Sequence, residues 1–359
     1  MNSKRTYAII GSGMMGLEHM RNLALVEGAE LAAVADPDVG SRERAEAQAK
    51  ALGQSIAVYE DSDQMLAQTA PDAVIIASPN FTHSDVVKPV MKAGCAILLE
   101  KPMCTTREDA LALEQAVRGY KPLFWVGLEY RFMPPATRFI ERVHAGEAGE
   151  IKMLSIREHR FPFLSKVGDW NRFNRNTGGS LVEKCCHFFD LMRHILQDEP
   201  VRVFASGGQD VNHLDELYNG EVPDILDNAF ALVDFAGGAR AVLDLCMFAE
   251  GSQDQEEISA VGPIGKLEVK LPSADVIWSP RDKSGPDVEP VSTAPEALAA
   301  GSHHGATCYQ LHHFHAALTS GSAPQITARD GYRSVVMGAA AQESIATGMP
   351  VAIDFEDEN

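Results

Sequence analysis

The sequence predicts an α/β fold in which an N-terminal, doubly wound parallel sheet is followed by an α/β domain with a large, mainly antiparallel open sheet. Two observations predict it. Short apolar runs alternate with helical stretches through the first third of the chain, and the first run leads into the glycine-rich segment 11–16. Beyond residue 125 the segments become longer and richer in β-forming residues. Because 359 residues exceed what one core usually supports, we expect two domains, residues 1–125 and 126–359.

The elements of the first domain follow from the positions of its apolar runs. Strands are expected at residues 7–10, 30–35, 56–59, 73–77 and 96–99. The glycine segment predicts a tight turn, and residues 17–26 predict the helix that follows it. Strands that alternate with helices pair in parallel, with the helices on both faces, which is the Rossmann arrangement.

The glycine turn and a later aspartate predict a dinucleotide site. Gly13 lets the backbone approach a pyrophosphate, which lies on the unpaired N–H groups at the start of the next helix. Asp36 ends the second strand, twenty residues past Gly16, where its carboxylate can accept hydrogen bonds from both ribose hydroxyls. Because a carboxylate repels a 2′-phosphate, the sequence favours NAD over NADP, a preference that the nearby Arg42 and Arg44 could soften.

The loop after the fourth apolar run is expected beside this cofactor. Ser78 and Asn80 follow that run, and ligands bind at the carboxyl ends of parallel strands. His83 begins the next helix, and the alternatives are that Thr82 only caps this helix and that His83 is a surface residue. The predicted cofactor-binding set is Gly11, Gly13, Met14, Met15, Gly16, Asp36, Ser78, Asn80, His83, Glu100 and Lys101.

Lys101 is the predicted catalytic cation. It follows the buried run at 96–99, so its ammonium can reach the substrate oxygen that changes between alcohol and carbonyl. A neighbouring positive nicotinamide would disfavour the charged lysine and ease proton exchange near neutral pH. The alternative is a surface ion pair between Lys101 and Glu100.

The second domain is expected to be rich in strands. They are predicted at residues 151–158, 201–206, 228–235, 239–248, 257–261 and 266–271, with Gly237-Gly238 as a tight hairpin turn. Helices are predicted at residues 135–144, 181–196, 309–319 and 331–347. Residues 279–302, rich in Pro, Gly, Ser and Ala, are expected to form a long surface excursion.

The predicted helix at 181–196 carries a predicted general acid/base. Glu183 and His187 are four residues apart, so on one helix they share a face, and the carboxylate would orient the imidazole. Asp190 could order His187 from the other side or cap a contact. Apolar neighbours indicate a mostly buried helix, where charged side chains are costly unless they are paired or functional.

A basic segment precedes that helix. Residues 157–175 contain five Arg or Lys residues against two acidic ones, in a chain of net charge −19. Trp170 lies within it and is suited to stacking on a sugar. This predicts a pocket wall that binds an anionic group, and the alternative is a basic surface loop that faces acidic neighbours or a partner subunit. The predicted substrate-binding set is Tyr130, Arg157, His159, Arg160, Lys166, Trp170, Arg172, Lys184 and His187.

Composition argues against several other classes of protein. The net charge of −19 disfavours nucleic acid and anionic membrane surfaces as partners. No apolar run approaches the roughly 18 residues of a membrane span. The six cysteines form no C-x-x-C pair and no zinc-like spacing, so we expect reduced thiols, no metal site and a cytoplasmic location.

The chain resembles the glucose-fructose oxidoreductase and inositol dehydrogenase (Gfo/Idh/MocA) family over essentially its whole length. The resemblance rests on the glycine turn, Glu100-Lys101-Pro102, Gly127 with Arg131-Phe132 and Pro134, and the segment 178–190. It implies Lys101 and His187 as the catalytic pair, a cis peptide before Pro102, and an open sheet used for homodimer or homotetramer contacts.

The sequence departs from the family pattern at two places. Glu183 stands where the family usually has an aspartate, and its longer side chain would shift the catalytic orientation. Lys184-Cys185-Cys186 stand where small or apolar residues are usual. Lys184 would add a second cation near the substrate, unless it points to solvent.

Three functions are compatible with these residues. The first is reversible hydride transfer between NAD and a sugar, sugar derivative or cyclitol, in which His187 takes the hydroxyl proton and Lys101 stabilises the alkoxide. The second is hydrolysis of an anionic glycoside by transient oxidation and elimination, with NAD kept bound. The third is a sugar-sensing regulator without turnover, which the retention of both residues argues against. The histidine-rich stretch 302–315 could close over the pocket or lie at the surface.

Overall fold

The computed structural model describes residues 4–282 and 284–356, which form two compact units. The first unit comprises Met1–Glu129, Lys166–Trp170 and Ala294–Tyr332, and the second comprises Tyr130–Ser165, Asn171–Thr293 and Arg333–Asn359. The first boundary is close to the predicted one after residue 125. Two segments from the predicted second domain, Lys166–Trp170 and Ala294–Tyr332, nevertheless join the first unit.

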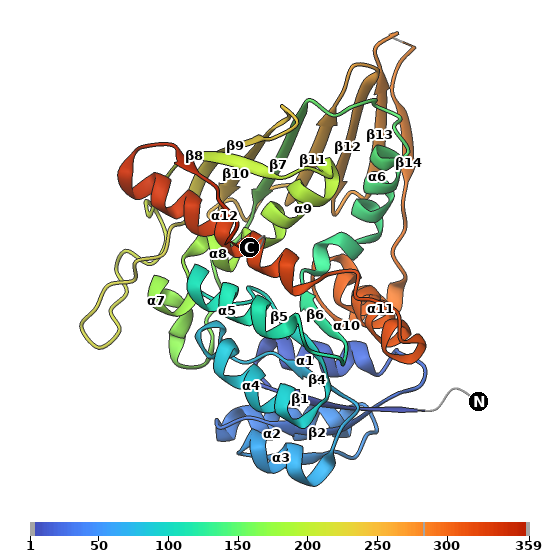
Figure 1. Cartoon of the computed structure of the whole chain (residues 1–359), viewed down its shortest axis with the longest axis vertical. Coiled ribbons are helices and arrows are strands. Elements are labelled where there is room, and N and C mark those ends of the chain that lie inside the picture. Colours follow the sequence, from blue (N-terminus) through green and yellow to red (C-terminus); the bar gives the residue numbers. More distant parts are fainter. Residues whose placement is uncertain (1–3, 283, 357–359) are drawn as a thin grey trace. The chain divides into compact units, whose positions relative to one another are not determined.

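The first unit contains the predicted parallel sheet. Its strand order is β3-β2-β1-β4-β5-β6, with all pairs parallel, and helices α1 to α5 lie against it (Figure 1). The strands are β1 (Arg5–Ile10), β2 (Ala29–Ala35), β3 (Ala57–Tyr59), β4 (Ala73–Ile76), β5 (Ala96–Glu100) and β6 (Phe124–Gly127). The helices are α1 (Met14–Leu23), α2 (Val39–Ala51), α3 (Ser62–Thr69), α4 (His83–Ala93) and α5 (Arg107–Val117). The strand order reverses between β1 and β4, so the loops after these strands flank the usual ligand crevice of such a sheet.

Residues from late in the chain complete the core of this unit. The helices α10 (Pro295–Ala300) and α11 (Ala306–Ser320), joined by the short helix η4 (His303–Gly305), pack near α1. Phe314 of α11 packs edge-on against Tyr7 of β1 and Trp125 of β6, with ring centroids 6.3 and 6.1 Å apart. Burial of these large aromatic rings is what ties α11 to the first unit.

The second unit contains a nine-stranded sheet in the order β14-β13-β12-β11-β7-β10-β9-β8-β15 (Figure 1). Only β7 and β10 pair in parallel, and all other neighbours in this order are antiparallel, as expected for a mainly antiparallel sheet. The strands are β7 (Met153–His159), β8 (Pro200–Gly208), β9 (Asn228–Phe235), β10 (Arg240–Cys246), β11 (Glu256–Val261), β12 (Gly265–Leu271), β13 (Asp275–Pro280), β14 (Asp287–Pro290) and β15 (Val351–Ala352). The predicted hairpin joins β9 to β10.

The prediction of a surface excursion at residues 279–302 is wrong in part. β14 lies within it as the edge strand beside β13, and α10 lies near its end. The polar side chains and prolines of this stretch suit an edge strand, whose outer side needs no hydrogen-bonded partner. The same composition is also typical of a loop, which is why it predicted one.

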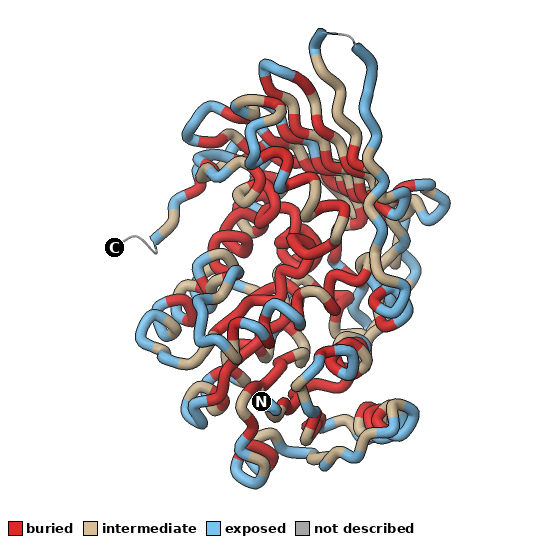
Figure 2. Tube along the Cα trace, turned by 90° about the vertical axis from the view of Figure 1, so that its right-hand side faces the viewer, coloured by how far each residue is buried: buried red, intermediate tan, exposed pale blue. Residues whose placement is uncertain are grey.

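One face of the nine-stranded sheet is covered by helices and the other is open. Along β7, Leu154, Ile156 and Glu158 are buried while Arg157 and His159 are only half-buried, and Figure 2 shows such alternation along the strands. The helix α6 (Pro134–His144) packs on β12 and β13. The same unit holds α7 (Asn174–Thr177), α8 (Ser180–Glu183), α9 (Cys186–Leu196) and the larger part of α12 (Ala328–Thr347).

Candidate active site

The glycine turn leaves space where a dinucleotide pyrophosphate would lie. Gly11 has a φ of +90°, and a Cβ there would lie 2.6 Å from the backbone that follows β4. A Cβ on Gly16 would lie 2.1 Å from the carbonyl oxygen of Gly11. Gly13 caps α1, and a Cβ there would meet no atom within 4 Å. The turn is therefore tight at two glycines and open at the third, beside the backbone N–H groups of Met14 and Met15, which fits a bound pyrophosphate.

Asp36 closes this turn from the end of β2. Its Oδ2 accepts hydrogen bonds from the backbone N–H of Ser12 (2.7 Å) and from the Ser12 hydroxyl (3.2 Å), and its Oδ1 accepts one from the N–H of Asp38 (2.9 Å). The carboxylate is thereby held at the carboxyl edge of the sheet. Arg42 donates to the backbone carbonyls of Asp36 (2.7 Å) and Pro37 (2.9 Å), so its guanidinium supports this loop.

His83 joins two loops at that edge of the sheet. Its Nε2 lies 3.1 Å from the carbonyl oxygen of Ser78, and its Nδ1 lies 2.9 Å from that of Pro102. The side chain is fully buried, so the alternative of a surface histidine is wrong. The peptide between Lys101 and Pro102 is cis, as the family resemblance implied. Contact of Ser78, Asn80 and His83 with the cofactor stays a prediction.

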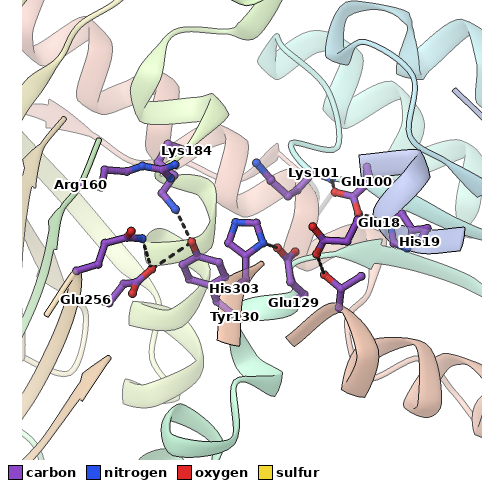
Figure 3. A network of polar contacts seen from close by, with 12 residues as sticks. Glu18, His19, Glu100, Lys101, Glu129, Tyr130, Arg160, Lys184, Glu256 and His303 are labelled. Atoms are coloured by element: carbon purple, nitrogen blue, oxygen red, sulfur yellow. Dashed lines mark hydrogen bonds and ion pairs between the residues drawn. The ribbon is translucent and has the colours of Figure 1, made fainter. Parts of the chain in front are cut away.

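Glu100 lies buried next to Lys101 (Figure 3). Its Oε1 lies 2.6 Å from Nε2 of His19, and its Oε2 accepts a hydrogen bond from the backbone N–H of Lys101 (3.2 Å). Burial alone would raise the pKa of Glu100, but the hydrogen bond and charge of His19, together with the charge of Lys101, hold that pKa below its usual value. A surface ion pair between Lys101 and Glu100 is therefore wrong.

Two further buried carboxyl groups near Lys101 escaped the sequence analysis. Oε1 of Glu18 accepts a hydrogen bond from the hydroxyl of Thr307 (2.8 Å). Glu129, 1% exposed and directly after the loop that follows β6, has its Oε1 3.6 Å from Nδ1 of His303. Burial and the neighbouring carboxyl groups raise the pKa of Glu129 to about 8, and the charge of Lys101 opposes this shift. The one signal in the sequence is a glutamate close after a buried strand at the ligand edge.

In the second unit, the imidazole of His187 stacks on Tyr130. The ring centroids are 4.0 Å apart and the planes differ by 10°. Phe188 packs edge-on against the same tyrosine at 5.7 Å. His187 is 1% exposed, so its ring is held by packing on an aromatic plate.

The predicted single helix over residues 181–196 is wrong. α8 ends at Glu183, and α9 begins at Cys186. Lys184 has a φ of −98° and Cys185 a ψ of −3°, so the backbone departs from helical geometry between the two helices. Glu183 and His187 are consequently on different helices, and the argument from a shared helix face does not hold.

Lys184 is the centre of a buried polar cluster, so the alternative in which it points to solvent is wrong (Figure 3). Its Nζ lies 3.0 Å from Oε1 of Glu158 and contacts the hydroxyl of Tyr130. Oε1 of Glu256 lies 3.5 Å from that hydroxyl, and a guanidinium nitrogen of Arg160 lies 3.4 Å from Glu158. Burial raises the pKa of Glu158 to about 7, against the opposing charges of Lys184 and Arg160.

Asp190 binds Arg131, and its role in ordering His187 stays a prediction. Both of its oxygens bind the guanidinium of Arg131, at 2.6 Å and 2.5 Å, in a two-point pair with both side chains buried. The pair joins α9 to the segment before α6. Its role in this structure is therefore to tie two segments of the second unit together.

The predicted basic wall is divided between separate surfaces. Arg157 and His159 lie on the open face of the sheet, opposite to Glu158, because side chains alternate along β7. There Arg157 pairs with Glu257 at 2.5 Å. Arg157 and His159 both line a cavity of about 440 Å³. Placing Arg157 and His159 in one wall with Lys184 is therefore wrong.

The other members of the basic segment also separate. Arg172, 3% exposed, donates to Glu216 (3.1 Å) and so holds its own loop in the second unit. Lys166 and Trp170 belong to the first unit, where the ammonium lies 4.5 Å from the centre of the indole. The indole packs edge-on against Phe81, beside Asn80 of the predicted cofactor set, with centroids 6.1 Å apart.

Within 4–282 and 284–356, no group of three or more His, Cys, Asp or Glu side chains is arranged to hold a metal ion. Over the same part of the chain, no helix combines the length and apolar character needed to cross a lipid bilayer.

Comparisons with known proteins agree with this geometry. Models of an oxidoreductase family match residues 5–128 as an NAD-binding Rossmann fold and residues 140–353 as a C-terminal alpha/beta domain. The scyllo-inositol 2-dehydrogenase (NAD(+)) of Bacillus subtilis (strain 168) is 28% identical over 355 residues, covering 97% of this chain and 96% of that protein. Inositol 2-dehydrogenase 2 of Saccharopolyspora erythraea is 27% identical, covering 97% and 95%. The crystal structure of a myo-inositol dehydrogenase from Corynebacterium glutamicum has the same fold, with a TM-score of 0.78, 22% identity and 98% and 99% coverage.

Proposed function

The chain belongs to the Gfo/Idh/MocA oxidoreductase family and binds NAD, and from this premise we propose that it is a dehydrogenase that transfers a hydride between a sugar or cyclitol and NAD. One observation carries the proposal. The chain matches NAD-dependent inositol dehydrogenases from end to end and keeps both Lys101 and His187. Inositols are rings of secondary alcohols, and their oxidation needs a proton acceptor and a group that stabilises an alkoxide.

Each residue has a distinct task in the proposed reaction. Bound NAD⁺ supplies the hydride acceptor, and the open side of the turn at Gly13 and the carboxylate of Asp36 would hold it. His187, stacked on Tyr130, takes the proton of the substrate hydroxyl. Lys101 stabilises the negative charge that develops on the substrate oxygen. Glu183 orients His187 in the original hypothesis, a role that now rests on the family resemblance alone.

An anionic substituent on the substrate is the narrower part of the proposal. With Arg157, His159 and Arg172 placed elsewhere and Lys184 paired with Glu158, Arg160 and Lys166 are the remaining cations of the predicted set that would bind it. The Arg160→Met and Lys166→Met variants should each raise KM for an acidic sugar about tenfold or more, because a charged hydrogen bond is worth roughly 1.5–3 kcal/mol. Arg157→Met is the matched control, since Arg157 lies on the open face of the sheet. An unchanged KM in both variants would remove the anionic group from the proposal.

The second candidate function is hydrolysis of a glycoside by transient oxidation. The observation in its favour is the cluster around Lys184, where the carboxyl of Glu158 has a pKa raised by burial to about 7. Elimination and readdition need acid and base groups beyond those of simple hydride transfer. The cluster supplies such a group near neutral pH.

One assay separates the two functions. Purified protein with NAD⁺ is given neutral and acidic sugars, inositols and their aryl glycosides, and both NADH and released aglycone are followed. NADH formed with a free sugar or inositol supports the dehydrogenase. Aglycone released without net NADH, and dependent on bound NAD⁺, supports the glycosidase. Cofactor binding without either product would support the regulator.

We also expect a homodimer or homotetramer built on the open face of the nine-stranded sheet. Phe204 of β8 and both Phe230 and Leu232 of β9 point to that face and are 43%, 62% and 46% exposed. Exposed apolar residues in register favour a protein contact. Light scattering should show the oligomer, and Phe230→Glu should dissociate it. Leu298→Glu, at an exposed leucine of α10, is the control.

A further inference from the structure

We propose that Glu129 is a charge-compensating proton site, which releases a proton through His303 when NAD⁺ binds and takes one up when the cofactor is reduced. The inference rests on the proposed function only in assigning the cofactor ring to the neighbourhood of Lys101. It names a task for a group that no part of the hydride-transfer mechanism uses.

The geometry around Glu129 brings three elements to one carboxyl group (Figure 3). α1 contributes Glu18, the end of β5 and the residue after it contribute Glu100 and Lys101, and η4 contributes His303. All of these residues belong to the first unit. Glu129 therefore responds to every charge that appears or disappears beside Lys101.

The two neighbouring carboxyl groups are already committed to other partners. Glu100 binds His19 at 2.6 Å and the backbone N–H of Lys101. Glu18 accepts the hydroxyl of Thr307 at 2.8 Å. Glu129 differs in that burial raises its pKa to about 8, so its proton exchanges close to physiological pH.

The backbone of η4 holds His303 in place at a cost in strain. His303, His304 and Gly305 have φ values of 55°, 54° and 81°, three successive residues in the left-handed region. A non-glycine residue is strained there, because its Cβ approaches the following carbonyl oxygen. Such strain persists where the surroundings enforce it, and it is often found at functional positions. Here it sets Nδ1 of His303 3.6 Å from the carboxyl of Glu129, while the side chain is still 20% exposed.

The proton step follows from charge. The nicotinamide ring is positive in NAD⁺ and neutral in NADH, so a positive ring beside Lys101 favours the ionised form of Glu129. The O–H bond of the carboxyl breaks, its electron pair stays on the carboxylate, the proton passes to neutral His303, and His303 releases it to solvent. After hydride transfer the positive charge is gone, and the carboxylate regains one proton by the same route. No oxidant or reductant is needed for this exchange.

Calorimetry of cofactor binding measures how many protons the protein releases when each cofactor binds. NAD⁺ and NADH are titrated separately into the full-length protein in buffers with different enthalpies of ionisation. At about pH 7.5, below the raised pKa of Glu129, NAD⁺ should release a substantial fraction of a proton more than NADH does. Glu129→Gln should abolish this difference while still binding both cofactors, because the amide keeps the shape of the neutral carboxyl.

Matched variants distinguish proton transfer from Glu129 through His303 from a general change in the structure of this cluster. Glu18→Gln, in the same cluster, removes a charge that helps to raise the pKa of Glu129, so the difference between the two cofactors should persist but move to lower pH. In stopped-flow experiments with a pH indicator, His303→Gln should slow the release several-fold without changing its extent, and His304→Gln, in the same strained turn, should do neither.

Equal proton release for both cofactors in the wild-type protein, or an undiminished difference in Glu129→Gln, overturns the proposal. If Glu129→Gln does not fold, the pH dependence of proton release by the wild-type protein decides. The difference in release between NAD⁺ and NADH must then disappear well below and well above pH 8. These readouts need only cofactor binding, so a failed sugar dehydrogenase assay would not be mistaken for failure of this inference.

Discussion

The ring of Tyr130 lies flat on the imidazole of His187, and the hydroxyl of the same tyrosine contacts Lys184. One residue thus links the predicted general base to the buried polar cluster around Lys184. The tyrosine stands close after β6, and the histidine begins α9 far along the chain. Their contact defines the centre of the candidate site in the second unit.

Replacing this ring should lower turnover. An aromatic stack is worth roughly 0.5–1.5 kcal/mol, so Tyr130→Leu should reduce kcat about 2- to 10-fold, with a smaller effect on KM. Tyr130→Phe is the matched control because it keeps the stack and removes only the hydroxyl. Equal kcat values for the leucine variant and the wild type would show that the stack does not position His187.

Removing the buried cation should destabilise the protein in a pH-dependent way. Lys184→Met removes the cation from the cluster that contains Glu158 and Glu256. Breaking a buried ion pair such as Lys184–Glu158 costs about 3–5 kcal/mol. The loss should be larger at about pH 8 than at about pH 6, because the pKa of Glu158, already raised to about 7, rises further and ionisation becomes costlier. Urea unfolding at both pH values measures this. The double variant with Glu158→Gln should regain part of the loss, and strictly additive effects would contradict the pairing.

Glu129→Gln should become relatively more stable as pH rises. The pKa of Glu129 in the folded protein, about 8, lies above its ordinary value of 4.5. Between these values the folded state keeps a proton that the unfolded chain has lost, so wild-type stability falls with rising pH. The variant has no such titrating group. The difference in free energy of unfolding, variant minus wild type, should therefore increase by up to about 1.4 kcal/mol per pH unit. A difference independent of pH would refute a raised pKa.

Asp36 should set the preference between the two nicotinamide cofactors. Asp36→Ala removes the charge that opposes a 2′-phosphate, so the ratio of Kd for NADP⁺ to Kd for NAD⁺ should fall about tenfold or more. Asp38→Ala is the control. Asp38 caps α2 by accepting the N–H of Ser41 at 2.7 Å, so its loss should lower stability without changing the ratio. Fluorescence titration with both cofactors gives the Kd values.

Asp190→Asn should affect stability more than catalysis. It leaves the buried guanidinium of Arg131 without its anionic partner, which we expect to lower the free energy of unfolding by about 3–5 kcal/mol. The pH profile of kcat for the folded fraction should stay the same, because both carboxylate oxygens of Asp190 bind Arg131. A shifted profile at unchanged stability would return Asp190 to the role first predicted for it.

Local patterns determined the first unit well. The glycine turn, the parallel strands and Asp36 depend on residues within one β-α-β segment, where spacing alone specifies geometry. The expected cis peptide before Pro102 and the hairpin between β9 and β10 are also present. Side chains alternate between the two faces of a strand, so Glu158 of β7 lies on the buried face with Leu154 and Ile156, and Arg157 lies on the other face. The sequence contains this alternation, but the prediction did not use it.

The sequence by itself determined the fold class, NAD as the cofactor and the identity of Lys101 and His187 as candidates, because each depends on short-range spacing. Only the tertiary structure decided which charged groups are buried together. Glu129 meets His303, and Lys184 meets Glu158, across long separations in the chain. Burial and the proximity of other charges control a pKa, and both arise from packing between distant segments, which no local pattern encodes.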